Sequence, residues 1–389
     1  MDMKYLSEYA GTFPTPAYVF DRSLFGKRAA LVKEAFGNKT DLCFSIKANP
    51  FLLYCLPKEF AKIEVCSPGE LTICEKVGAD MDMVIFSGVN KTAADVARAM
   101  EDKVGTFTAE SMLHLQIIND CAVRNGKKVP LLLRLTGGSQ FGMDEQEFLQ
   151  IIRNREQYPG VKIVGLHYFT GTQKRKVSVI EKELDLVEAF LEKVETECGF
   201  RLERVEYGTG LAVDYFQEDA DASEAQRLTA IAPRIRALAE KVHLTVEMGR
   251  FFAAPCGFYF TTVTDTKTNC GINYAILDGG LNQLKYDGQI QGMQIPAITH
   301  IGAKSGEESQ PWTLCGSLCT TADVLARNAK FSGLKIGDQL IFHRTGAYSA
   351  MEGMAIFLSR EMPVIALYSP ETGIKIVREH ICTDIFNTP

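Results

Sequence analysis

One lysine stands at the end of an apolar run in the first part of the chain. Residues 42–49 read LCFSIKAN, so Lys47 follows side chains that are typical of a buried strand. A buried ammonium is costly unless it is paired or takes part in chemistry. Two interpretations follow. Lys47 could form an ion pair with an acid such as Glu64 or Glu247, or it could be an amine of lowered pKa that forms a Schiff base with a carbonyl cofactor.

Two glycine-containing segments favour the second interpretation. GTG (Gly208, Thr209 and Gly210) and the end of EMGR (Gly249 and Arg250) each follow a strand-like run. Glycine leaves backbone N–H groups accessible to phosphate, and an arginine adds a charged donor. Together with a lysine, these segments indicate a phosphorylated aldehyde, and pyridoxal 5′-phosphate (PLP) is the obvious candidate.

Glu247 would then have a specific role beside the cofactor. A carboxylate next to the pyridine nitrogen keeps that nitrogen protonated, so negative charge developing at the substrate α-carbon is drawn into the ring. The alternative for Glu247 is a salt bridge with Arg250 or Lys47, and the sequence leaves it open.

A regular scaffold must bring these residues together. From residue 42 to about residue 249, short β-rich runs alternate with stretches that have apolar residues at i, i+3 and i+4 spacing. The eight strand-like runs are residues 42–48, 63–67, 84–88, 106–110, 129–136, 163–169, 204–208 and 243–249. Eight strands with helical crossovers predict a (β/α)₈ barrel. Its active site should lie at the C-terminal ends of the strands, with phosphate bound after strands seven and eight.

The last third of the chain has a different pattern. GFYFTTVTDTK, NYAILDGG, QLIFHRTGAY, PVIALYS and IKIVRE are strand-like and separated by turn residues, whereas TADVLARNA has a helical pattern. We therefore expect an α/β fold in which residues 23–252 form a TIM-type barrel and residues 253–389 form an all-β domain. The strand in PTPAYVFD, within residues 1–22, could pair with either domain and is assigned to the β-domain.

Strand alternation predicts which side chains face the barrel interior. Neighbours such as Phe44, Ile46, Val65, Leu133, Leu135, Leu166, Tyr168, Val246 and Met248 should face the helices. The side chains expected to point inward near the strand ends are Ser45, Lys47, Glu64, Cys66, Arg134, His167, Phe169 and Glu247.

The overall composition excludes several classes of protein. Hydrophobic residues make up 46% and charged residues 23% of the 389 residues, which is ordinary for a globular protein. A net charge of -6 without a long basic run argues against nucleic acid and acidic membranes as partners. Eleven scattered cysteines and six histidines show no zinc spacing, and a reducing, cytoplasmic compartment fits them best. Neither an export signal nor a membrane-spanning segment is expected.

The ordered motifs resemble those of the fold-type III PLP-dependent decarboxylases, the family of diaminopimelate, ornithine and arginine decarboxylases. SIKAN is similar to the cofactor-lysine motif, EVCSPGEL to the strand-two motif and GLHYFTGTQ to the strand-six motif. YGTGLAVDY resembles the glycine-rich phosphate loop and EMGR the strand-eight motif, while CGSLCTTADVLA and HRTGAYS resemble motifs of the β-domain. The similarity runs from PTPAYVFD to GAYS and covers nearly the whole chain.

This resemblance implies roles for individual residues. Lys47 would form the Schiff base, Glu247 would pair with the pyridine nitrogen, and Cys319 would be the general acid that protonates the α-carbon after carbon dioxide leaves. Arg134 would reach the cofactor's phenolic oxygen, and Asp323 would support the substrate side. The phosphate would be held by Thr172, Gly208, Thr209, Gly210, Gly249, Arg250 and Tyr348. The resemblance also implies an obligate homodimer, in which Cys319 of one chain reaches the barrel of the other.

Departures from the family pattern bear on the substrate. Phe169 stands where ornithine and diaminopimelate decarboxylases place a histidine that stacks on the cofactor, and His167 could partly compensate. Thr320 replaces the acid that meets a distal amine in the diamino-acid enzymes. Lys285 lies near the place of the arginine that binds the distal carboxylate of diaminopimelate. The segments QFGMDE, YFTGTQ and CTTAD are most similar to the secondary-metabolism branch that includes the butirosin-pathway enzyme, which acts on carrier-tethered or modified amino acids.

The expectation is therefore an α-decarboxylase that releases an amine and carbon dioxide. The alternatives are a diaminopimelate decarboxylase proper, a fold-type III racemase and a catalytically silent PLP-binding regulator. The basic run Lys174, Arg175 and Lys176 is either solvated surface or a grip for the phosphate of a phosphopantetheine arm.

Overall fold

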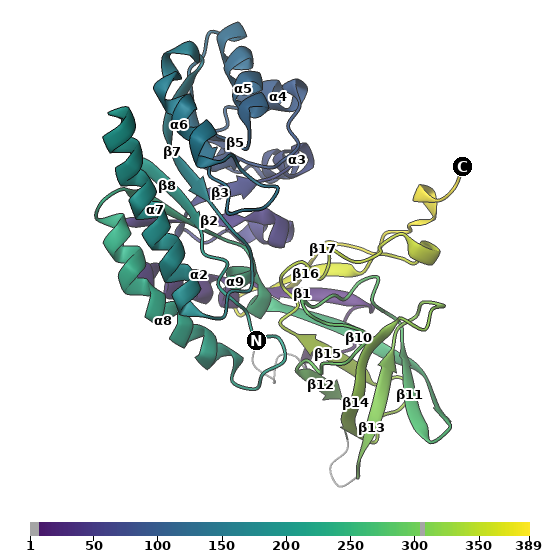
Figure 1. Cartoon of the computed structure of the whole chain (residues 1–389). Helices are drawn as coiled ribbons and strands as arrows, with labels where there is room; N and C mark the ends of the chain where they lie inside the picture. The colour runs from purple at the N-terminus through teal and green to yellow at the C-terminus, as the bar shows by residue number, and fades with distance from the viewer. Residues whose placement is uncertain (1–7, 304–307) are drawn as a thin grey trace. The chain divides into compact units, whose positions relative to one another are not determined.

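The computed structural model describes residues 8–303 and 308–389, which form two compact units. One unit consists of Arg28–Ala212 and Ala222–Phe251. The other consists of the described residues up to Lys27 together with Val213–Asp221 and Phe252–Pro389. Each unit has a sheet of its own (Figure 1).

The first unit is a closed barrel of eight parallel strands in sequence order. Its strands are β2 (Thr40–Ser45), β3 (Phe60–Val65), β4 (Val84–Phe86), β5 (Thr106–Ala109), β6 (Val129–Arg134), β7 (Val161–Tyr168), β8 (Arg204–Gly208) and β9 (His243–Met248). β9 pairs with β2 and closes the barrel. The predicted (β/α)₈ barrel is therefore confirmed.

Helices connect successive strands and form the outer layer of the barrel (Figure 1). They are α2 (Arg22–Phe36), α3 (Pro68–Val77), α4 (Ala93–Glu101), α5 (Met112–Arg124), α6 (Glu145–Arg153), α7 (Val177–Cys198), α8 (Ala220–Ala239) and the short α9 (Arg250–Ala253). Among the described residues, no helix has both the length and the apolar character needed to cross a membrane.

Capping residues start several of these helices close to the preceding strand. The side chain of Ser67 accepts the N–H of Glu70 at the start of α3, with Pro68 in the first turn. Thr92 and Asp95 form a reciprocal capping box at the start of α4. The side chain of Ser111 accepts the N–H of His114 at the start of α5. These caps fix where each helix begins, and so they fix the loops at the C-terminal ends of the strands.

The barrel interior has an apolar layer and a polar layer. Cys43, Ile85, Leu132 and Val164 form a buried apolar cluster. Farther along β2, Ser45 pairs with Glu64 of β3, while Cys43 pairs with Glu247 of β9. Because alternate side chains of a strand share a face, Cys43 and Ser45 both point inward, as the predicted alternation requires.

Lys47 lies beyond the strand in which it was expected. β2 ends at Ser45, and Ile46–Ala48 form a 3₁₀ turn, so the prediction of a strand over residues 42–48 was wrong at its C-terminal end. The side chain of Asn49 accepts the N–H of Phe51, and Pro50 begins a second 3₁₀ helix, Pro50–Cys55. Proline cannot donate to a sheet, and the asparagine cap turns the chain away from it.

The second unit contains a nine-stranded sheet. β1 (Ala17–Asp21) pairs antiparallel with β10 (Gly257–Asn269) and parallel with β16 (Val364–Ser369). The remaining strands are β11 (Ile272–Leu277), β12 (Ile298–Ile301), β13 (Ser309–Cys315), β14 (Val324–Ser332), β15 (Gln339–His343) and β17 (Gly373–Arg378). Its core includes Val19, Phe258, Phe260, Ile341, Val364 and Tyr368.

The helix predicted for TADVLARNA is wrong, because Val324–Ser332 form strand β14. β14 pairs antiparallel with β13 through register shifts, and Asn328 has a φ of 57°. Over so short a run, buried Val324, Ala326 and Ala329 are compatible with either periodicity. Pairing with β13, which the sequence did not reveal, decides between them.

Candidate active site

The amine of Lys47 lies among three acidic or sulfur-containing side chains at the mouth of the barrel. Its Nζ is 2.9 Å from Glu64 Oε2, 3.6 Å from Glu247 Oε1 and 3.4 Å from Cys66 Sγ. Glu64 is 2% exposed and Glu247 7%, whereas the Lys47 side chain is 37% exposed. The ion pair and the accessible amine are therefore present together.

Glu247 is held as a carboxylate. Ser45 Oγ donates a hydrogen bond to Oε1 over 3.1 Å, and His167 Nε2 lies 3.3 Å from Oε2. Burial by itself raises the pKa of Glu247, but the Lys47 ammonium and His167 outweigh it, and the net pKa lies well below the usual range. A permanent negative charge therefore lies inside the barrel.

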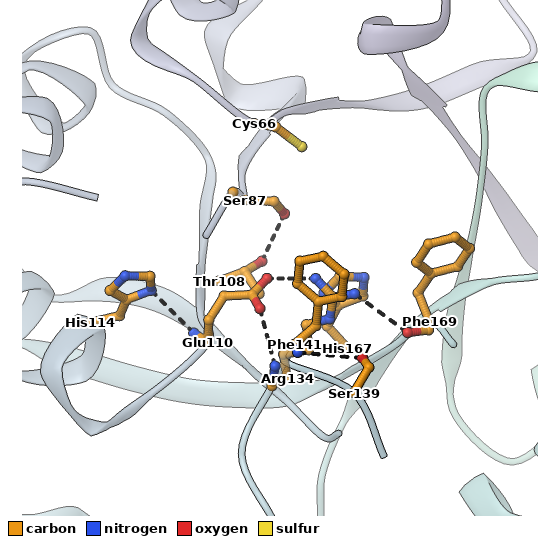
Figure 2. Close-up of polar contacts among 12 residues, drawn as sticks. Cys66, Ser87, Thr108, Glu110, His114, Arg134, Ser139, Phe141, His167 and Phe169 are labelled. Carbon is orange, nitrogen blue, oxygen red and sulfur yellow. Dashed lines mark hydrogen bonds and ion pairs between the residues drawn. The ribbon is translucent and has the colours of Figure 1, made fainter. Parts of the chain in front are cut away.

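A second ion pair lies at the C-terminal ends of β5 and β6, at the mouth of the barrel. Arg134 Nη1 is 2.6 Å from Glu110 Oε1, and the Gly142 N–H donates to Oε2 of the same carboxylate over 3.2 Å. Arg134 Nη2 also donates to the carbonyl of Phe169 over 3.4 Å. Figure 2 shows Arg134 between Glu110 and the loop that carries Phe169. These bonds fix the guanidinium and the start of that loop.

The glycines of the phosphate-loop motif allow close approach of neighbouring segments. A Cβ on Gly208 would lie 2.5 Å from Phe169 Cδ2, and a Cβ on Gly249 would lie 2.7 Å from the Cβ of Ala48. Gly210 has a φ of 60°, and a Cβ there would lie 1.9 Å from the Gly171 carbonyl oxygen. The loop after β8 is therefore in direct contact with the loop after β7, and the loop after β9 with the turn after β2, which only glycine permits at these positions.

Two further predicted cofactor residues lie at these loop ends. Arg250 Nε donates to Thr172 Oγ1 over 3.4 Å, which joins the loop after β9 to the loop after β7. Thr209 is buried, and its Oγ1 accepts the N–H of Leu211 over 3.2 Å. The structure thus brings together the predicted cofactor residues of the barrel.

The basic run after β7 is divided between two environments. Lys174 Nζ is 2.7 Å from Glu183 Oε2, and both side chains are about nine-tenths buried. Arg175 and Lys176 are exposed. Lys174 is therefore a structural member of the barrel mouth, and only its two successors face solvent.

A family model described as "Pyridoxal-dependent decarboxylase, pyridoxal binding domain" matches residues 22–254. The chain belongs to this family. It is a PLP-dependent amino-acid decarboxylase, as the sequence motifs implied.

Several relatives of this decarboxylase have known names and structures. A diaminopimelate decarboxylase of Aquifex aeolicus is 27% identical over 364 residues, which are 88% of this chain and 84% of that protein. The structure of diaminopimelate decarboxylase from M. jannaschii in complex with L-lysine has a TM-score of 0.86 at 23% identity, covering 98% of this chain and 93% of that one. Lysine/ornithine decarboxylase from Vibrio vulnificus complexed with cadaverine has a TM-score of 0.81 at 24% identity, covering 93% and 95%. These likenesses show the shared fold.

The side chains at the barrel mouth fit the pyridoxal cofactor of this family. An accessible amine can link to an aldehyde, an ionised buried carboxylate can pair with a protonated pyridine nitrogen, and an anchored guanidinium can donate to a phenolic oxygen. Among the described residues, no group of three or more His, Cys, Asp and Glu side chains could hold a metal ion.

The remaining predicted residues of the decarboxylase lie in the β unit. Cys319 and Thr320 are exposed on the loop between β13 and β14. Asp323 is 1% exposed, and its two oxygens accept the N–H groups of Leu281 over 2.7 Å and Leu318 over 2.8 Å. The contacts of Asp323 therefore hold in place the loop that presents Cys319.

Two other predicted residues of the β unit have distinct surroundings. Tyr348 is partly buried and has a φ of 65°, a backbone conformation that costs free energy in any residue with a side chain and is often found at functional sites. Lys285 Nζ is 2.8 Å from Glu352 Oε2 at the surface.

Sequence reasoning missed several charged residues of the barrel. Glu110 ends a predicted strand and was not recognised as the partner of Arg134. Lys91 is 5% exposed, and burial lowers its pKa to about 8 although Glu110 raises it. Glu206 is 1% exposed; burial, together with Glu247 and Glu64, raises its pKa well above the usual value. The inward parity of Glu206 on β8 was the available signal, because it matches that of Gly208.

Proposed function

We propose that this decarboxylase acts on an amino acid, or an amino-acid conjugate, whose distal end is not a free amine. The observation that carries the proposal is Thr320, which is exposed directly after Cys319 on a loop fixed by Asp323. A threonine cannot form the charge-assisted bond, worth about 1.5–3 kcal/mol, that a carboxylate offers to a distal ammonium.

A cavity in the β unit supports the same substrate class. It has a volume of about 320 Å³ and is lined partly by apolar side chains such as Leu281, Leu284 and Met354. Two of its lining residues are charged, Lys285 and Glu352, and they pair with each other. We propose, as the family pattern implies, that Lys285 meets the distal group of the substrate. A neutral distal group leaves that ion pair intact, whereas a charged one competes with it.

The barrel residues have defined tasks in this proposal. PLP, when bound, supplies an aldehyde for the amino group and a ring that accepts the electron pair left at the α-carbon as carbon dioxide departs. Lys47 Nζ would hold the cofactor through its aldehyde. Glu247 would keep a proton on the pyridine nitrogen, and Arg134 would donate to the phenolic oxygen. The N–H groups of Gly208–Gly210 and Gly249, with Thr209, Thr172, Arg250 and Tyr348, would hold the phosphate.

Cys319 supplies the proton that the α-carbon needs after carbon dioxide leaves. By resemblance to the family, we propose that it acts in the barrel of a second subunit, so that a homodimer has two shared sites. We also propose a cytoplasmic location, in keeping with the lack of disulfides in the described chain. Mixing inactive K47A with inactive C319A protein should restore part of the activity, because one of the two sites in a mixed dimer is then complete. Absence of any recovery, with both variants folded, would contradict the shared site.

A substrate panel tests the proposed specificity. Carbon dioxide release is measured for amino acids that end in a free amine, a carboxylate, an amide or a pantetheine thioester, with K47A as the control. We expect the highest kcat/KM for an amide or a thioester, as in the carrier-tethered substrates of the butirosin-pathway branch. Relatives named diaminopimelate decarboxylase make that diamino acid the main competitor. If free diaminopimelate is the best substrate, the proposal fails, and a change of chirality without carbon dioxide would indicate a racemase.

A further inference from the structure

Glu183 of α7 accepts hydrogen bonds from three side chains, one on β8 and two in the loop after β7. Its carboxylate accepts hydrogen bonds from Tyr207 on β8 over 2.7 Å, from Lys174 over 2.7 Å and from the hydroxyl of Thr170. Glu183 is 8% exposed. A buried carboxylate with this many partners fixes the geometry of every donor around it, and Lys174 is the one cation in the set.

Lys174 is also fixed through its backbone. Its N–H donates to the Gly210 carbonyl over 2.8 Å, and its own carbonyl accepts the N–H of Ala212 over 3.2 Å. A Cβ on Gly210 would lie 3.1 Å from Lys174 Cε. Lys174 therefore joins the loop after β7 to the glycine-rich loop after β8.

The ammonium of Lys174 lies near the ring of Phe169. Nζ is 5.7 Å from the ring centroid, within the range of a cation–π interaction. Burial lowers the pKa of Lys174 and Glu183 raises it, with a net value below the usual one. A Cβ on Gly208 would lie 2.5 Å from Cδ2 of the same ring, so only glycine leaves room for the ring at that position. The orientation of Phe169 is thus determined by a glycine and by a lysine.

The ammonium of Lys174 favours a phenyl ring at position 169 and disfavours a protonated imidazole there. The negative face of a phenyl ring attracts an ammonium, whereas a protonated histidine would be repelled by it and would lose its proton more easily. Phe169 occupies the position at which diamino-acid decarboxylases of the family place their stacking histidine. The presence of Lys174 therefore matches the absence of a titrating ring.

We propose that Lys174 and Glu183 are positioning residues for the cofactor site. They fix the Phe169 ring that faces the cofactor, and they make this position unsuitable for a charged ring. The inference rests on the proposed function, with pyridoxal phosphate bound at Lys47, and on the family resemblance that implies stacking of Phe169 on this cofactor. It adds that the stacking contact here is set by a buried ion pair and does not titrate.

Titration of an introduced imidazole tests the electrostatic half of the proposal without any need for activity. The imidazole in F169H is followed by NMR of protein labelled at histidine, and the same is done for F169H/K174M and F169H/E183Q. We expect its pKa to be lowest in F169H/E183Q, intermediate in F169H and highest in F169H/K174M, with about a tenfold change in proton affinity between the extremes. A pKa that is the same in all three would overturn the proposal.

Cofactor binding tests the positioning half. We expect K174M to weaken PLP binding about fivefold to thirtyfold and to shift the visible absorbance of the bound cofactor. E183Q should leave the affinity unchanged or raise it, because it keeps the cation. If both variants weaken binding equally without shifting the absorbance, the pair is only structural and the proposal fails.

Two controls complete this experiment. K176M removes an exposed lysine two residues away and should leave the affinity unchanged. K174M/E183Q removes both charges and provides a folded reference if K174M alone unfolds; it should still show the absorbance shift. Cofactor attachment, on which the proposed function depends, is tested separately by K47A, and the substrate panel tests the specificity. If wild-type protein gains cofactor absorbance and K47A does not, attachment at Lys47 stands whatever the result at Lys174.

Discussion

The two units of the chain fix their candidate residues in different ways. In the barrel, charged side chains are held by one another, as in Lys47 with Glu64 and Glu247, or Arg134 with Glu110. In the β unit, Cys319 and Thr320 lie exposed on a loop whose backbone is held by the single buried carboxylate of Asp323.

This difference shows where chemistry and where stability should respond to substitution. When one charged side chain of the barrel is replaced, its former ion-pair partners stay in place. The electrostatics of the site then change while the strands persist. Removing the Asp323 carboxylate leaves the N–H groups of Leu281 and Leu318 without their acceptor, so the loop itself is lost.

Loss of Lys47 should have the largest effect on activity. K47A should abolish carbon dioxide release and the visible absorbance of the bound cofactor, because no other amine replaces it. K47R is the matched variant, since it keeps a cation beside Glu64 and Glu247 but cannot link to an aldehyde. Borohydride treatment of wild type with PLP should attach the cofactor to Lys47, as detected by mass spectrometry of peptides. Attachment at a different lysine would refute this assignment.

Loss of the Glu247 charge should be the next largest effect. E247Q should lower kcat by about a hundredfold to a thousandfold while the cofactor still binds, because the amide cannot hold a proton on the pyridine nitrogen. E64Q is the comparison, since Glu64 also contacts Lys47. We expect a clearly smaller loss of kcat in E64Q. Equal losses in steady-state kinetics would mean that Glu247 acts only as an ion-pair partner.

Asp323 provides the corresponding test in the β unit. D323N keeps one acceptor but places an amide against the second backbone N–H, and it should reduce the free energy of unfolding by about 2–4 kcal/mol. T320A, on the same loop, should change stability by less than about 0.5 kcal/mol. Urea unfolding measures both. Cofactor absorbance should survive in D323N, and its loss in the folded protein would show that Asp323 also affects cofactor binding.

The smallest effect concerns two histidines, one in each unit. Burial lowers the pKa of His114 in the barrel and of His343 in the β unit to about 4. Because the unfolded chain binds these protons near pH 6.5 and the folded chain does not, stability is complete above that pH and declines as the pH falls toward 4. We expect each group to contribute roughly 1–2 kcal/mol to this decline. Unfolding of H114Q and H343Q between pH 7 and 4.5 should show a shallower decline, and unchanged pH dependence would contradict it.

The barrel could be predicted well because each of its strands and helices is indicated by a short, continuous stretch of sequence. Each strand is a short β-rich run followed by a helix with its own cap, and alternation then orients residues such as Glu64 and Glu247. The position of Lys47 was less accurate, because the cap formed by Asn49 ends the strand early. The partners Glu110 and Glu183 could not be inferred, since Glu110 reaches Arg134 from the end of the neighbouring strand and Glu183 reaches Lys174 from a helix to a loop. Such contacts have no periodic signature in the sequence.

The β unit was harder to predict for a related reason. β14 takes its conformation from pairing with β13, and the apolar pattern of so short a segment fits a helix equally well. The function of Asp323 as acceptor for Leu281 and Leu318 depends on contacts between loops, which have no periodic signature. Motif resemblance found the residues of this unit, but their surroundings required the structure.

The contact between Gly208 and Phe169 bears on how this family could change its substrates over time. The ring atoms that would meet a side chain at position 208 are Cγ and Cδ2, and both are present in phenyl and in imidazole. Replacement of phenylalanine by histidine at position 169 therefore meets no steric barrier at Gly208. The choice between the two rings would then depend on the neighbouring charge, which in this chain is the ammonium of Lys174.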